Sequence, residues 1–218
     1  MNVGVNNLVK NGDFSKGTVA NSDTAPTNWN FWGGTWVFGG QGQTNYNLSR
    51  TLYIAHKTTD CGISTDNLNL KPNTRYTISF SFGIESISNC YNAIEYYNSD
   101  NSRATIPSTP FVYDMSKQDT IQSFTFTTPS DFAFCHFCSN AHADSADGCY
   151  LTRLGNVVIV EGNKAPSSFV YNQDELQGQI NSATTRISSC ESSISQQAGE
   201  ISSKVSSTDF SNYQSYNN

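Results

Sequence analysis

The chain has 218 residues, 14% of them charged, and a formal net charge of −6 at pH 7. Typical globular proteins carry about 25% charged residues, so this surface relies on Ser, Thr, Asn and aromatic side chains. An acidic chain without a basic cluster predicts that neither nucleic acid nor an anionic membrane surface is a partner.

The N-terminal segment, Met1 to Lys10, has neither an apolar stretch nor a basic lead, so we expect no signal peptide. The longest apolar run in the body, residues 157–160, is far too short to span a bilayer. A protein that is made in the cytosol and released by lysis has this pattern, and so does a domain excised from a longer chain.

Apolar and polar residues alternate with a period of two between Asn7 and Tyr171, which predicts strands. The clearest case is residues 77–84, where Ile78 and Phe80 face one way and Thr77 and Ser79 the other, as in a strand with one buried and one polar face. Strands are expected at 51–56, 77–84, 91–97, 122–127, 132–137 and 150–160, separated by turns at 71–73, 98–101, 128–131 and 146–148. Many short strands with frequent turns predict an all-β fold, an antiparallel jelly-roll β-sandwich.

The period changes to seven between Gln173 and Val205, which predicts a helix. The repeating residues are Ile180, Ile187, Ile194 and Ile201. The second apolar heptad position holds Leu176, Ala183 and Cys190, and then turns polar at Gln197 and Lys204. This pattern predicts a coiled-coil stalk, with one amphipathic helix docked on the sandwich as the alternative. Because β-branched Ile fills the first position and Leu the second only at 176, we expect a parallel homotrimer through Leu176 and the four isoleucines.

Three regions follow from these patterns: a sandwich over residues 1–171, a stalk helix over 172–206, and a polar tail over 207–218 that is expected to be disordered.

Several segments resemble the carbohydrate-binding jelly rolls of xylanases and cellulases. They are Asn7–Ser15 (NLVKNGDFS), Trp29 after Ala-Pro-Thr-Asn, Asn69–Phe80 (NLKPNTRYTISF) and Leu154–Asn163 (LGNVVIVEGN). Residues 165–169 leading to Asp174, followed by the isoleucine heptads, are similar to the stalks of siphophage baseplate and tail-tip proteins. The matching motifs are structural, so they specify the fold better than the ligand.

The resemblance implies a non-catalytic module of a phage tail that adheres to host cell-wall or surface polysaccharide. It implies further tail proteins as partners, and a place in the virion with extracellular exposure after release. It also implies a structural calcium ion with Asp13 and Asp174 as side-chain ligands. A spacer module without a ligand is the alternative, and a glycoside hydrolase would need two carboxylates facing each other across a cleft.

Sugar rings are held by aromatic faces and by side chains that hydrogen-bond their hydroxyls. Trp29, Trp32 and Trp36 cluster within residues 28–40, and Trp29 matches a core position of the resembling family. The candidate carbohydrate-binding residues are therefore Trp32, Trp36, Tyr96, Tyr97 and Tyr113, although half-buried packing is the commoner role of strand tyrosines.

One cysteine-rich segment contains zinc-type ligands, namely Cys135, Cys138, His142 and Cys149. A disulfide within the same group and free thiols are the alternatives. Because the chain is large and has no export signal, we expect reduced cysteines and no zinc.

Overall fold

The computed structural model describes residues 6–17, 22–37, 51–56, 60–85, 89–142, 150–204 and 207–216. The chain divides into two compact units, Met1–Gln173 and Asp174–Asn218, and each is described by itself.

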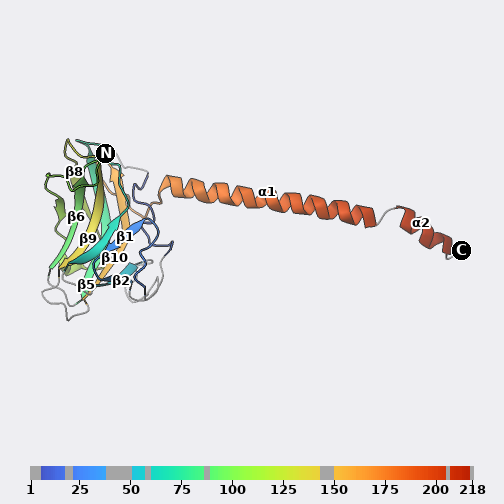
Figure 1. Ribbon diagram of the computed structural model, residues 1–218, viewed down its shortest axis with the longest axis horizontal. Coiled ribbons are helices and arrows are strands. Elements are labelled where there is room, and N and C mark those ends of the chain that lie inside the picture. The colour runs from blue at the N-terminus through green and yellow to red at the C-terminus, as the bar shows by residue number, and fades with distance from the viewer. Residues whose placement is uncertain are drawn as a thin grey trace. The chain divides into compact units, whose positions relative to one another are not determined.

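The first unit is a sandwich of two antiparallel sheets (Figure 1). The described strands are β1 (Trp29–Trp32), β2 (Thr35–Val37), β3 (Thr51–His56), β4 (Cys61–Thr65), β5 (Arg75–Glu85), β6 (Asn89–Tyr97), β7 (Thr109–Phe111), β8 (Ile121–Thr127), β9 (Phe134–His142) and β10 (Tyr150–Glu161). One sheet has the order β1-β4-β9-β6-β7 and the other β2-β3-β10-β5-β8. The predicted antiparallel sandwich is confirmed, and it is consistent with a jelly roll.

Strand β5 shows how alternation in the sequence places side chains. Ile78 and Phe80 are fully buried between the sheets, as expected for the apolar face of the strand. Thr77 and Ser81, on the polar face of the strand, are also buried. Their hydroxyls donate to the carbonyls of Gly162 and Gly155, so hydrogen bonds within the protein replace those to water.

The core between the sheets is rich in aromatic rings. The ring centroids of Phe80 and Phe137 lie 5.1 Å apart, and those of Phe14 and Trp29 lie 4.8 Å apart. Trp29 is only 4% exposed, which confirms its predicted core position, and its indole N–H donates to the Asn11 carbonyl at 3.1 Å. Pairs of this kind join strands from both sheets into one core.

Asn7 ties the N-terminal segment to the last strand. Its Oδ1 accepts hydrogen bonds from the backbone N–H groups of Val9 and Ile159, both at 3.0 Å, and its Nδ2 donates to the Val157 carbonyl. Asn172 donates in turn to the Asn7 carbonyl at 2.8 Å. Because these amide groups are buried, their hydrogen bonds avoid the free-energy cost of removing them from water without a partner.

The second unit is helical, with α1 (Gln173–Lys204) and α2 (Ser207–Tyr216). The helix begins at the residue expected from the heptads, but residues 207–216 form α2 where we expected a disordered tail. The opening Ser-Thr-Asp of that segment contains residue types that favour a helix start. No helix in the described part of the chain is long and apolar enough to cross a membrane.

Candidate functional site

The outer face of the β1-β4-β9-β6-β7 sheet carries a polar hollow of about 320 Å³, called here the cleft. Because neighbouring residues of a strand point to opposite faces, Ile94 and Tyr96 of β6 enter the core while Glu95 and Tyr97 reach the cleft. The lining residues are Trp32, Asp60, Ser64, Glu95, Tyr97, Arg103, His136, Cys138 and Asn140.

Trp32 lies against the strand beside it because Gly62 has no side chain. The two residues are partners in the β1–β4 pair. A Cβ placed on Gly62 would lie 2.5 Å from Cζ2 of the indole, closer than van der Waals contact permits. The glycine therefore allows the ring of Trp32 to settle on the sheet, where the half-buried indole lines the cleft.

Glu95 is the centre of a hydrogen-bonded group in the cleft. Its Oε1 accepts from Nη2 of Arg103 at 2.5 Å, and its Oε2 accepts from the Tyr97 hydroxyl at 3.1 Å. Burial, followed by the charge of Glu95, raises the pKa of Tyr97 to about 12, so the hydroxyl stays protonated and donates. The Arg103 side chain is well exposed, which leaves the rest of its guanidinium fork open to a ligand.

Aromatic stacking fixes the position of Tyr97. Its ring is parallel to that of Phe134, with centroids 5.4 Å apart, and the edge of His136 meets it at 4.9 Å. Nδ1 of His136 lies 2.6 Å from the Thr65 carbonyl. Since a carbonyl only accepts, Nδ1 carries the proton of this hydrogen bond.

Asn140 supplies an acceptor without a partner. Its Nδ2 donates to Asp60 Oδ1 at 3.1 Å, which orients the amide. Its Oδ1 is buried and accepts no hydrogen bond in the part of the chain that the structure describes. A buried carbonyl of this kind is satisfied when a ligand hydroxyl donates to it.

The cleft contains two of the five predicted aromatic residues, Trp32 and Tyr97. Trp36 lies in β2, but its side chain is outside the described residues. Tyr96 is 2% exposed with its hydroxyl 2.9 Å from that of Thr109, and Tyr113 also belongs to the core. Neither residue lines the cleft, because both side chains lie on the inner side of the sandwich.

The polar residues of the cleft other than Tyr97 were missed from the sequence. Glu95 and Tyr97 follow the period-two pattern of β6, which was a usable signal once the inward residues were known. Arg103 reaches Glu95 only because the turn at residues 98–101 folds the chain back, and Asn140 and His136 come from β9. Their convergence depends on strand pairing that a single sequence does not specify.

The cysteine-rich segment does not form a shared metal site around Cys135 and Cys138. Three residues apart on β9, their side chains lie on opposite faces, with Cys135 in the core and Cys138 in the cleft. Both are free thiols whose pKa is raised by burial. Cys149 and the side chain of His142 are outside the described residues.

Among the described residues, no group of three or more His, Cys, Asp or Glu side chains is placed to hold a metal ion. Asp13 is buried and its Oδ1 accepts from the backbone N–H of Ser15 at 3.2 Å. Asp174 belongs to the helical unit, and a calcium ion held by both residues stays a prediction.

A family described as a carbohydrate binding domain matches residues 6–138, more than half of the chain. The chain belongs to this carbohydrate-binding family. The matched residues run from the N-terminal segment to Cys138 of β9, and they include every cleft residue except Asn140. A comparison with curated proteins gave no match.

Several solved structures are similar to this carbohydrate-binding chain. The enzymatically active domain of tailspike protein 4 of Bacteriophage CBA120 is 10% identical, with a TM-score of 0.49 over 72% of this chain and 21% of that one. The CBM22-1 xylan-binding domain of Paenibacillus barcinonensis Xyn10C is 11% identical, with a TM-score of 0.46 over 76% of this chain and 100% of that one. The C-terminal family 22 carbohydrate binding module of Clostridium thermocellum Xyn10B is 14% identical, with a TM-score of 0.44 over 64% and 88%.

The chain spans about a fifth of the tailspike structure that it matches. At these identities and scores, the similarities assign neither a ligand nor an activity to this chain.

Proposed function

We propose that the chain is a non-catalytic module that binds a neutral glycan in the cleft. The observation that carries this proposal is the grouping of the Trp32 and Tyr97 rings with hydrogen-bonding side chains in one open hollow. An aromatic face contacts the C–H groups of a pyranose ring, and the hydroxyls pair with Glu95, Arg103 and Asn140. The unpartnered Oδ1 of Asn140 supports a binding role over that of a spacer without a ligand.

The polar groups of the cleft suit hydroxyls because both donors and acceptors are already oriented. Hydrogen bonds to charged groups are worth about 1.5–3 kcal/mol, and neutral ones about 0.5–1.5 kcal/mol. Much of this gain offsets the lost freedom of the ligand, so one cleft alone gives weak binding. The site therefore benefits from several copies acting together.

We infer that α1 supplies those copies by assembling as a parallel three-stranded coiled coil. Its four heptad isoleucines, Ile180, Ile187, Ile194 and Ile201, are 58%, 59%, 65% and 62% exposed. They recur every seven residues on one stripe, which is the pattern of a coiled-coil seam. Linked weak sites gain avidity of roughly 10²–10⁴ over one site when geometry permits.

A phage tail is the setting that we propose for this assembly. The stalk sequence, with Ser, Thr, Gln and Glu between the isoleucines, resembles tail-tip stalks. The ligand would then be host cell-wall or surface polysaccharide, and the neighbours other tail proteins of the virion.

Binding to a glycan array and to host cell-wall polysaccharide tests the glycan role. We expect Trp32→Ala to lose at least tenfold in affinity, because the ring platform is removed. Tyr171→Ala is a matched control, since Tyr171 is a partly exposed aromatic residue of the same unit outside the cleft. Equal binding by both variants and the wild type would refute the assignment of the cleft.

A further inference from the structure

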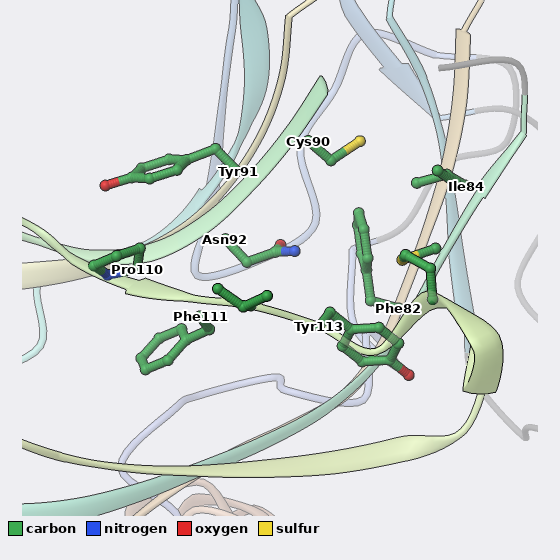
Figure 2. A pocket seen from close by; sticks show the side chains of 10 residues that line it. Phe82, Ile84, Cys90, Tyr91, Asn92, Pro110, Phe111 and Tyr113 are labelled. Atoms are coloured by element: carbon green, nitrogen blue, oxygen red, sulfur yellow. The ribbon is translucent and has the colours of Figure 1, made fainter. Parts of the chain in front are cut away.

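A second pocket of about 250 Å³ opens at one end of the sandwich, beside β5, β6 and β7 (Figure 2). It shares no lining residue with the cleft. Its lining residues are Phe82, Ile84, Cys90, Tyr91, Asn92, Pro110, Phe111, Val112, Tyr113 and Met115. An apolar cavity of about 150 Å³ is large enough to bind benzene, so this pocket has room for a substituted ring.

One polar group in this pocket lacks a partner. Asn92 is 4% exposed, and its Oδ1 accepts no hydrogen bond within the described residues. Figure 2 shows its amide among the side chains of Phe82, Cys90 and Ile84. Its backbone is held in register between Ser139 of β9 and Phe111 of β7, so the side chain cannot leave without disturbing the sheet. A ligand that donates one hydrogen bond would satisfy this acceptor.

The remaining walls select a neutral and aromatic ligand. None of the ten lining residues is Asp, Glu, Lys, Arg or His. Burial raises the pKa of Cys90 to about 12, so the thiol stays neutral at physiological pH. Phe82, Phe111 and Tyr113 contribute ring edges and faces that suit another ring. At the mouth, Val112 is well exposed, and the flexible Met115 can adapt to different substituents.

We propose that this pocket binds a small neutral phenol, with its ring among Phe82, Phe111 and Tyr113 and its hydroxyl donating to Oδ1 of Asn92. An aromatic hydrocarbon would fit the walls but leave the carbonyl unpaired. A charged ligand would lose its hydration without gaining an ion pair. The proposal does not depend on glycan binding, because the two sites have no residue in common.

Titration with para-cresol and with its methyl ether, para-methylanisole, tests this pocket directly. The two probes share the ring, but only para-cresol donates a hydrogen bond. Shifts of the backbone amides of residues 92 and 113 in two-dimensional NMR report the site in the wild type and in variants, and the titrations give the affinities. We expect para-cresol to bind the full chain roughly tenfold more tightly than the ether, the value of one well-placed hydrogen bond to a buried acceptor.

Asn92→Leu removes the carbonyl while keeping the shape of the side chain, so the fold is retained. In this variant we expect the preference for para-cresol to disappear while the ether still binds. Trp32→Ala, which alters only the cleft, should leave both affinities unchanged. Equal binding of the two probes to the wild type, no binding of either at millimolar concentration, or a preference that survives Asn92→Leu would overturn the proposal.

Discussion

Substitution of Ile187 by Asn tests whether α1 assembles, and the structure sets the size of the effect. The Ile187 side chain is 59% exposed in the single chain. Full burial of an Ile side chain gains about 1.5–3 kcal/mol, so covering this one in a seam gains ~1–2 kcal/mol. A three-stranded coil contains one Ile187 from each chain, and losing the layer therefore costs the assembly about 3–5 kcal/mol. This corresponds to a roughly 100- to 4,000-fold rise in the overall dissociation constant.

Light scattering and sedimentation equilibrium measure this change directly. We expect the wild type to have about three times the 23.9 kDa mass of one chain, and Ile187→Asn to dissociate at the same concentration. Thr185→Asn is the matched control. It also replaces a β-branched residue by Asn, but in a heptad position outside the seam, and Thr and Asn have similar helix propensity.

Three results distinguish the possible outcomes. A wild type that stays monomeric at high concentration would refute the stalk. Equal masses for Ile187→Asn and Thr185→Asn would refute the isoleucine seam. A particle of two chains would keep the seam but replace the trimer by a dimer, and the expected avidity would fall accordingly.

Two further predictions concern the sandwich. Asp119→Asn should lower the free energy of unfolding by about 3–5 kcal/mol in a urea titration. The reason is that the Asp119 carboxylate accepts two hydrogen bonds from Arg153, at 2.7 and 2.9 Å, and the Arg153 side chain is only 2% exposed. Asn tolerates the φ of 64° at this position, so backbone strain does not contribute to the loss. A loss as small as that of the exposed Asp131→Asn would contradict the buried ion pair. Because the pKa of Tyr97 is raised to about 12, its contribution to folding stability should be constant below the ordinary tyrosine pKa of about 10 and fall between about pH 10 and 12. Tyr97→Phe should reduce that fall, and an unchanged pH profile in thermal melts of this variant would rule out the shift.

The sequence predicted the strands whose alternation is long and unbroken. Residues 51–56 form β3 as expected, and 77–84 lie within β5. Four short strands were missed, including β4, which contains Gly62, and β7, which contains Pro110. Gly and Pro have low strand propensity, so they weaken the strand pattern in the sequence. In this sheet, hydrogen bonds to the neighbouring strands stabilise β4 and β7 in place of local propensity.

The cleft was only partly predictable for a similar reason. Residue type alone selected Trp32 and Tyr97, which line the cleft, but it also selected Tyr96, one position away from Tyr97 on the same strand. Adjacent strand residues face opposite ways, so the choice between the two requires knowing which side of β6 is covered by the other sheet. The same rule separates Cys135 from Cys138, which the spacing had placed together.

Strand β6 lines both cavities, and this explains how one strand can serve two ligand chemistries. Glu95 and Tyr97, near the C-terminal end of the strand, face the polar cleft, while Cys90, Tyr91 and Asn92, near its start, line the apolar pocket. The cleft offers charged and hydroxyl groups that suit the proposed sugar ligand, whereas the pocket offers aromatic walls and one carbonyl. Because the two cavities take different residues from the strand, each can be altered by substitution without replacing a residue of the other. The affinities of the two sites can therefore be measured independently. When a substitution abolishes binding at one site, unchanged binding at the other shows that the variant still folds.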